Sequence, residues 1–266
     1  MFASKNTNTK PEFPIHFACS NGDLLTLQQE LTKIELHHEQ ASTNKEAPTK
    51  RAKFPLREIL TQKDNDGRTL LHWCVSMQHE NMLDYLIDKY NENKIDIDDL
   101  FDDAGWNPVH IASNTTLSTM RKLFTGLKIK PDANKQTLKT LSTPLHISCS
   151  KVTNLPIISY LIVEQKASVR VKDKRGRLPI HIACCIDNSI DIIKILCEHN
   201  SPVNVKDSVD GWTPMHHAMA EGNLGVAIYL VQEYDADYKT ITSNDDKTPL
   251  DVAVSDTFKE SFLENI

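Results

Sequence analysis

The sequence predicts an all-α solenoid, a fold in which short pairs of helices stack along one axis. The first observation is a tetrapeptide of the Thr-Pro-Leu-His type, which recurs seven times in 266 residues and is followed each time by a helix pattern of small residues. The second is the spacing, because the histidines of the first six copies are separated by 56, 38, 36, 35 and 35 residues. Self-similarity at a period of about 20 to 50 residues indicates stacked repeats. The copies begin at Phe13, Thr69, Asn107, Thr143, Leu178, Thr213 and Thr248.

Each copy predicts two short helices, and the sixth copy shows why. Proline lacks the N–H that the first turn of a helix leaves unpaired, so a helix begins near Pro214. Met215 and Ala218 then lie three apart on one face, and Leu224 to Val231 forms a second, more apolar helix behind them. A single unit cannot bury its apolar face, so seven helix-turn-helix units stack. A period close to the roughly 33 residues of ankyrin repeats predicts an ankyrin-repeat solenoid with a long concave surface.

A polar turn with a glycine precedes several of the helix pairs. Three of these turns are Asp64 to Gly67, Asp102 to Gly105 and Asp173 to Gly176. Glycine adopts the left-handed conformations that tight turns require. We therefore expect the turns to form β-hairpin fingers, with the residue after the glycine pointing toward the concave side.

The repeats predict one elongated domain at residues 11–266, after a flexible N-terminus at 1–10. Residues 37–53 break the period and are polar, so they are interpreted as a disordered insertion in repeat 1, with repeats 2 to 7 near 64–266. The insertion is either a tolerated surface loop, the interpretation we favour, or a partner-contacting arm. The first unit and the last, where Asp251 replaces the repeat histidine, should cap the stack.

Composition narrows the classes of function. The net charge of −6, with 30 basic and 36 acidic residues, favours a protein partner over nucleic acid. No apolar run of about 18 residues is present and the N-terminus is too polar for a signal peptide, so we expect no membrane association and a soluble, intracellular chain, monomeric when alone. Six cysteines without a CxxC pair indicate reduced, packed thiols, including the adjacent Cys184 and Cys185.

The repeat histidines are interpreted as structural. They lie one repeat apart, too far to share a metal ion, so we expect each ring to hydrogen-bond the backbone of a neighbouring turn. The P-loop, GxGxxG, HExxH and GxSxG motifs are absent from the sequence. The sequence therefore predicts no metal, no cofactor and no catalytic residues, which leaves binding.

The tryptophans point to a binding surface. Trp106 and Trp212 directly follow a turn glycine, and Trp73 follows a repeat histidine. Arg68 and Arg177 also follow turn glycines, so this column mixes aromatic and cationic side chains, as binding hot spots do. Each tryptophan either contacts a partner or packs against the neighbouring finger, and one ring can do both.

The predicted finger tips differ in charge along the chain. The acidic residues of the first fingers are Asp64, Asp66, Asp102 and Asp103. The basic residues of a later finger are Lys172, Lys174, Arg175 and Arg177. A partner with the reverse order of charge would be steered into one register, since charge complementarity acts mainly on the association rate and on specificity. The alternative is a set of ordinary solvated turns.

Two finger sequences and the helices that follow them indicate a family. Asp64-Asn65-Asp66-Gly67-Arg68 leads into Leu71-His72-Trp73-Cys74, and Asp102-Asp103-Ala104-Gly105-Trp106 leads into His110-Ile111-Ala112. These segments resemble gankyrin, and Gly211-Trp212-Thr213-Pro214 with Ala220-Glu221-Gly222 is similar to its fungal counterpart. The resemblance covers nearly the whole chain. The 37–53 insertion departs from it, and the LxCxE stretch of gankyrin is not preserved, so a retinoblastoma-type partner is not carried over.

The resemblance implies a non-catalytic assembly chaperone for the base of the proteasome's regulatory particle, in cytoplasm and nucleus. Its concave face would hold the C-terminal domain of one AAA+ ATPase subunit and sterically hinder premature docking on the proteasome core. By position, Asp66, Arg68, Trp73, Asp103 and Trp106 would face this partner. The full set of candidate partner-binding residues is Asp64, Asp66, Arg68, Trp73, Asp102, Asp103, Trp106, Lys174, Arg175, Arg177, Trp212 and Glu221.

A second function would use the same face. An ankyrin-repeat inhibitor or adaptor of a kinase or transcription factor, in the cytosol or nucleus, needs the same solenoid and the same concave surface. The repeat period does not separate the two hypotheses, and only the finger sequences favour the chaperone.

Overall fold

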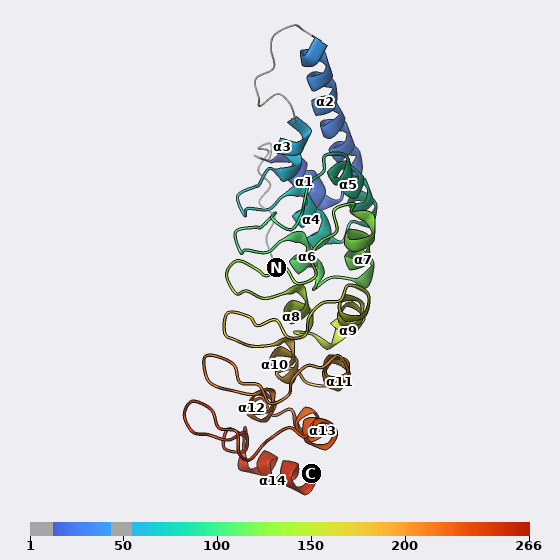
Figure 1. Cartoon of the computed structure of the whole chain (residues 1–266). Helices are drawn as coiled ribbons and strands as arrows, with labels where there is room; N and C mark the ends of the chain where they lie inside the picture. The colour runs from blue at the N-terminus through green and yellow to red at the C-terminus, as the bar shows by residue number, and fades with distance from the viewer. Residues whose placement is uncertain (1–12, 44–54) are drawn as a thin grey trace, which may run out of the picture.

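The computed structural model describes residues 13–43 and 55–266, whose helices form two parallel columns with fingers projecting from one of them (Figure 1). The expected flexible N-terminus at 1–10 and most of the expected insertion lie outside the described residues. The inner column, next to the fingers, contains α1 (Pro14–Asn21), α4 (Leu70–Met77), α6 (Pro108–Ala112), α8 (Pro144–Ser148), α10 (Pro179–Cys184) and α12 (Pro214–Ala220).

The outer column packs behind the inner one. It contains α2 (Leu24–Thr43), α5 (Glu80–Glu92), α7 (Leu117–Gly126), α9 (Leu155–Ser159) with its π-helical continuation η3 (Tyr160–Glu164), α11 (Ile190–Glu198) and α13 (Leu224–Tyr234). The remaining helices are α3 (Pro55–Thr61), the short 3₁₀ turn η2 (Val152–Asn154) and α14 (Asp256–Glu264). This arrangement confirms the predicted ankyrin-repeat solenoid.

The apolar core runs along the whole stack between the two columns. Each inner helix contacts the next inner helix and its own outer helix. Leu145, Ile180 and Met215 of three successive inner helices are completely buried, and Phe262 of α14 closes the core at the C-terminal end. Because each unit supplies only one slice of this core, its stability depends on its neighbours.

A repeated histidine joins each unit to the next. In the fourth unit, His146 Nδ1 accepts hydrogen bonds from the Thr143 N–H at 3.2 Å and from the Thr143 hydroxyl at 2.8 Å. The ring proton is therefore on Nε2, which donates to the carbonyl oxygen of Arg177 in the next finger at 3.0 Å. The expectation that the rings bond to neighbouring backbone is confirmed. The equivalent Nε2 bonds run from His16 to Gln62, His72 to Trp106, His110 to Lys135, His181 to Val205 and His216 to Lys247.

The fingers are hairpin turns, and the described residues contain no regular strand. In the first finger, the N–H groups of Asp64 and Gly67 donate to the carbonyls of Arg68 and Asp64, each at 3.0 Å. The Asp103 N–H then donates to the Asp66 carbonyl at 3.1 Å, which links this finger to the next. Gly67 has φ 70°, and a Cβ there would approach the Asp103 backbone nitrogen to 2.6 Å. Glycine therefore permits both the turn and the close stacking of fingers.

The structure corrects the expected start of the insertion. Helix α2 continues to Thr43, so residues 37–43 are helical and not a disordered loop. Glu, Gln and Ala are good helix formers and the segment contains no glycine or proline, so its polarity did not break the helix. Helix α3, which precedes the first finger, was not predicted.

The seventh unit is shorter than a full helix pair. Its first half, residues 249–252, is a turn, and only its second half is a helix, α14. The Asp251 carboxylate accepts from the N–H and the hydroxyl of Thr248, at 2.9 and 2.7 Å, as the histidine does elsewhere. A carboxylate has no N–H to donate to a following finger, and residues 252–266 form none. The expected C-terminal cap is therefore a turn and one helix.

We predict that Leu145→Ala lowers the free energy of unfolding by about 2 to 5 kcal/mol, because it leaves a cavity at a completely buried position of the core. Urea unfolding followed by circular dichroism measures the change. Leu138→Ala is the matched control, since Leu138 is 61% exposed at a finger tip and its truncation should change stability by less than about 0.5 kcal/mol. Equal effects of the two substitutions would mean that the core is assigned wrongly.

The histidines also predict a pH dependence of stability. Burial lowers the pKa of His72, His110 and His181 to about 4, below the ordinary value of 6.5. Between these values the unfolded chain binds more protons than the folded chain, so stability is fully present above pH about 6.5 and is lost as the pH falls. Each of the three should contribute up to about 1.4 kcal/mol per pH unit in this window.

Urea titrations between pH 7 and pH 5 test this dependence. His110→Gln should reduce the slope of unfolding free energy against pH, even though it lowers stability at pH 7. A slope that is flat in the wild type, or unchanged in the variant, would contradict the assignment.

Candidate functional site

All the fingers project to the same side of the inner column, and we call this side the finger face (Figure 1). It comprises the residue after each repeat histidine, namely Phe17, Trp73, Ile111, Ile147, Ile182 and His217, and the fingers at 64–68, 102–106, 137–142, 173–177, 207–212 and 243–247. Eleven of the twelve predicted binding residues belong to this set, and Glu221 lies at the C-cap of α12.

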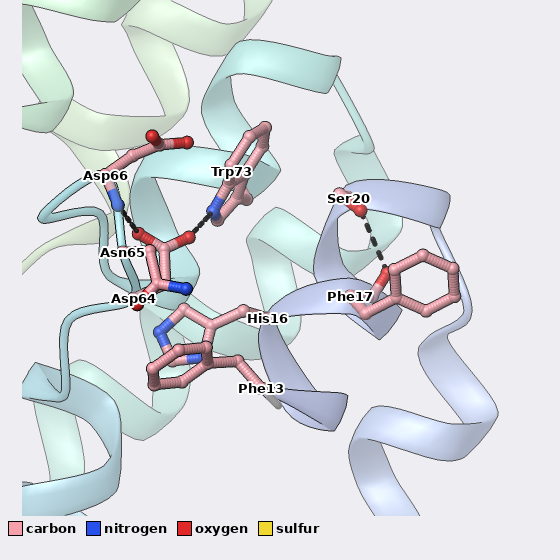
Figure 2. Close-up of a pocket in the computed structure, with 8 residues that line it drawn as sticks. All are labelled: Phe13, His16, Phe17, Ser20, Asp64, Asn65, Asp66 and Trp73. Carbon is pink, nitrogen blue, oxygen red and sulfur yellow. Dashed lines mark hydrogen bonds between the residues drawn. The ribbon is translucent and has the colours of Figure 1, made fainter. Parts of the chain in front are cut away.

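The N-terminal part of the finger face is organised around Asp64 and Trp73 (Figure 2). Asp64 Oδ2 accepts from the Trp73 indole N–H at 2.6 Å, and Oδ1 accepts from the N–H groups of Asp66 and Arg68 at 3.0 and 2.9 Å. Burial disfavours the charged form of Asp64, but these hydrogen bonds outweigh it and lower the pKa of the carboxyl group. Asp64 is therefore an ionised group that fixes the finger and the tryptophan together.

Arg68 connects this finger to the next one. Its guanidinium lies 4.7 Å from the centre of the Trp73 ring, and its Nε is 3.7 Å from Asp102 Oδ2. Asp102 is buried, and its Oδ1 accepts from the Trp106 N–H at 2.8 Å. Asp103 and Asp66, at the two finger tips, remain exposed. The structure thus brings seven predicted residues together, namely Asp64, Asp66, Arg68, Trp73, Asp102, Asp103 and Trp106. The carboxylates of Asp64 and Asp102 bond within the turns, whereas Asp66 and Asp103 are exposed to solvent.

A second cluster occupies the fifth and sixth units. The Arg177 guanidinium donates to the Asp173 carboxylate from Nη2 at 2.8 Å and from Nε at 3.0 Å. Arg175 Nη2 pairs with Asp210 at 2.8 Å, across to the next finger. Lys174 is exposed. Arg175 and Arg177 are therefore partly neutralised by carboxylates of the same chain. This weakens the expected contrast between acidic and basic fingers along the finger face.

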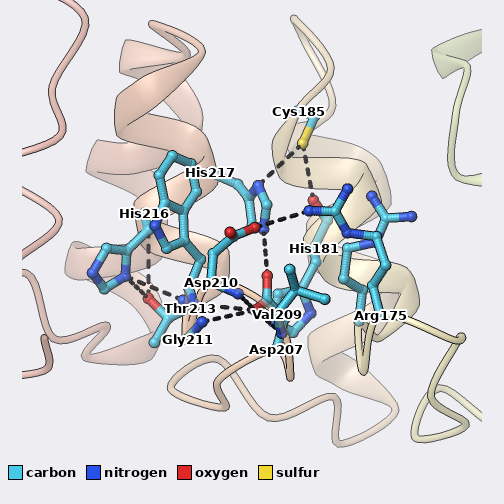
Figure 3. Close-up of polar contacts among 12 residues, drawn as sticks. Arg175, His181, Cys185, Asp207, Val209, Asp210, Gly211, Thr213, His216 and His217 are labelled. Atoms are coloured by element: carbon cyan, nitrogen blue, oxygen red, sulfur yellow. Dashed lines mark hydrogen bonds and ion pairs between the residues drawn. The ribbon is translucent and has the colours of Figure 1, made fainter. Parts of the chain in front are cut away.

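Trp212 is held by the fifth finger, at 207–212, and the helix that follows it. Its ring stacks on His216, with centroids 6.1 Å apart, and meets His217 edge-on at 5.2 Å. Asp207 Oδ1 accepts from the backbone N–H groups of residues 209–212 (Figure 3). Asp207 Oδ2 is 3.5 Å from His217 Nε2, and both atoms are buried. Trp212 is thus packed and still partly exposed, so the two roles open to it are compatible.

Cys185 lies on the other side of His217 (Figure 3). Its Sγ donates to the His181 carbonyl at 3.3 Å and is 3.7 Å from His217 Nδ1. Burial, followed by the Glu221 carboxylate, raises the pKa of the Cys185 thiol to about 11. A thiol that stays protonated at neutral pH is a poor nucleophile. Cys185, His217 and Asp207 therefore form a packed row of polar side chains. This agrees with the packed thiols that the sequence predicts, and all six cysteines are free.

Sequence reasoning missed part of the finger face. Phe17, Asp207 and His217 line it next to predicted residues. The position after each repeat histidine, already noted for Trp73, would have identified Phe17 and His217. Asp207 is the first residue of its finger, like Asp64, and that equivalence would have identified it.

The described residues contain no cluster of three histidine, cysteine or acidic side chains able to hold a metal ion. In the same residues, each helix is too short or too polar to span a bilayer.

Comparisons with known proteins agree with this geometry. The family model described as ankyrin repeats in three copies matches residues 2–137, 114–207 and 145–242. The Saccharomyces cerevisiae protein described as a probable 26S proteasome regulatory subunit p28 is 36% identical over 256 residues, which cover 96% of this chain and 99% of that protein. The Gallus gallus nuclear factor NF-kappa-B p105 subunit is 26% identical over 76% of this chain but only 20% of its own length.

Solved structures show the same fold. The ankyrin repeat domain of Bcl-3 superposes with a TM-score of 0.68 at 20% identity, covering 98% of this chain and 100% of that one. The human ASB11 ankyrin repeat domain has a TM-score of 0.69 at 18% identity, covering 95% and 97%. Together with the yeast relative, which matches along nearly its whole length, these observations show that the chain belongs to the ankyrin-repeat proteins and, within them, to the gankyrin family, with a sequence of the fungal type.

Proposed function

We propose that this protein is a non-catalytic assembly chaperone for the base of the proteasome's regulatory particle, acting in the cytoplasm and nucleus. Its finger face would bind the C-terminal domain of one AAA+ ATPase subunit. The bulk of the bound solenoid would then hinder that subunit from docking prematurely on the proteasome core. The observation that carries the proposal is the similarity to yeast p28 over 96% of this chain and 99% of the relative.

The geometry of the finger face supports a protein partner. Arg68 and Trp73 are held against each other by Asp64 and Asp102, so few side-chain rotamers are lost when they bind. Trp212 is similarly held by two histidine rings. Preorganised arginine and tryptophan side chains that remain partly exposed are the groups most often found at interface hot spots. An interface of about 1,200 to 2,000 Å² would suffice for a stable complex.

The alternative is an inhibitor or adaptor of a kinase or transcription factor. The p105 similarity, at 26% identity over part of the repeats, leaves this class open. A pull-down with the purified chain, read by mass spectrometry, separates the two. Recovery of regulatory-particle ATPases supports the chaperone. Recovery of a kinase or transcription factor without any ATPase supports the alternative.

We predict that Trp106→Ala combined with Arg68→Glu weakens binding of the ATPase C-terminal domain by at least about 2 kcal/mol, because both side chains act as hot spots. Isothermal titration with the purified domains measures the affinity, and circular dichroism verifies that the variant is folded. Lys128→Glu is the charge-matched control, since Lys128 is exposed just after the outer helix α7 and away from the fingers.

The control should bind like the wild type. Unchanged affinity in the double variant would remove these two residues from the interface. A wild-type chain that binds none of the ATPase C-terminal domains would overturn the chaperone proposal itself.

A further inference from the structure

A buried carboxylate joins the segments that lead into the second and third fingers. Asp98 lies before the second finger, and its Oδ2 accepts from the N–H of Asp132, which lies before the third, at 2.8 Å. Asp98 is only 9% exposed. Its other carboxylate oxygen, Oδ1, is buried and has no hydrogen-bond donor among the described residues. This oxygen has therefore lost its hydration without gaining a bond in exchange, which is costly for a charged group.

Asparagine makes the same joint at the equivalent positions of two later units. Asn134 Oδ1 accepts from the Ser168 N–H at 2.7 Å. Asn204 Oδ1 accepts from the Asp237 N–H at 2.9 Å, and its Nδ2 donates to the Asp235 carbonyl, two residues earlier, at 3.4 Å. An amide can accept one bond and donate another, whereas an ionised carboxylate can only accept. Aspartate in place of asparagine therefore removes the donor from this joint.

The groups around Asp98 disfavour its ionised form. Asp96, on its own segment, and Asp132, on the next one, are both acidic. Lys135 favours the negative charge, but its ammonium group donates to Asp99 at 2.9 Å. Burial outweighs the bond from the Asp132 N–H and, together with the two carboxylates, raises the pKa of Asp98 from its ordinary value of 3.8 to about 6.

We propose that Asp98 is a pH-sensitive joint between the second and third fingers. The ionised carboxylate holds the next segment by one bond and keeps a buried oxygen unpaired. When Asp98 takes up a proton, its Oδ1–H donates to the carbonyl of Lys130, two residues before Asp132, as the Asn204 amide donates in its own joint. The joint then has two bonds in place of one, so it is tighter at mildly acidic pH than at neutral pH.

The joint lies at the base of the finger that carries Trp106. The Asp98 carbonyl accepts from the side chain of Asn107 at 3.4 Å, and Asn107 caps the N-terminus of α6 directly after Trp106. The protonation state of Asp98 therefore controls how firmly the second finger is held against the third.

The effect of Asp98 on stability is opposite in sign to that of the repeat histidines. Between pH 3.8 and about 6 the folded chain keeps a proton on Asp98 that the unfolded chain releases. The contribution of this proton to stability is complete below pH 3.8 and is lost as the pH rises through about 6.

NMR tests the joint directly. The carbon-13 signal of the Asp98 carboxyl group, assigned with Asp98→Asn, should titrate with a midpoint near pH 6. Hydrogen-exchange protection of the Asp132 amide, corrected for the intrinsic exchange rate, should rise as the pH falls from 7 to 5 in the wild type and stay constant in Asp98→Asn. A midpoint near the ordinary 3.8, or protection that does not change with pH in the wild type, would overturn the proposal.

Urea unfolding at two pH values gives an independent test, because Asp98→Asn imitates the protonated side chain. The ratio of the unfolding equilibrium constants, wild type to variant, should fall about tenfold between pH 7 and pH 5, as linkage requires for a pKa raised from 3.8 to about 6. Asp88→Asn is the charge-matched control, since Asp88 is exposed on α5, and its ratio should stay constant. A constant or rising ratio for Asp98→Asn on acidification would contradict the proposed joint.

Discussion

The hydrogen bond from a buried histidine ring to the backbone of the next unit is the interaction on which this solenoid depends. In His146, Nδ1 accepts from Thr143 and Nε2 donates to Arg177, so one neutral ring caps its own helix and fixes the following finger. Six units repeat the bond. The ring must stay neutral and buried to do this, which couples the stacking of units to pH. In the seventh unit, Asp251 keeps only the capping half of this role, because a carboxylate has no N–H to donate.

The histidine bonds also position the surface that is available to a partner. Each of them holds a backbone carbonyl in or before a finger, and backbone bonds such as that from Asp103 to Asp66 connect one finger to the next. Side chains on the fingers are therefore presented at a regular spacing along a rigid support. The first residue of a finger, such as Asp64 or Asp207, uses its carboxylate inside the turn. Fewer acidic side chains are consequently available to a partner than the number of acidic residues in the fingers implies.

Membership of the gankyrin family and the geometry of the finger face support the same kind of function. Arginine and tryptophan side chains of this face are held in place by neighbouring carboxylates and histidine rings. Such a surface is suited to contact with a protein partner. The Cys185, His217 and Asp207 chain illustrates the difference, because burial raises the pKa of its thiol and leaves it protonated.

The sequence by itself determined the repeat, the start of the inner helix at Pro214 and the role of the histidines, because these depend on local spacing and on hydrogen-bonding groups that every unit carries. It also located four of the six fingers from their glycines, while the fingers at 137–142 and 243–247 contain none. The helix propensity of residues 37–43 already favours the continuation of α2 to Thr43, and their polarity alone does not predict a loop. Local sequence could not show that Arg175 pairs with Asp210 of the next finger, or that Asp102 is buried beside Arg68 of the preceding one. Those contacts join side chains from different turns and units, and only the stacking of the solenoid sets the distances between them.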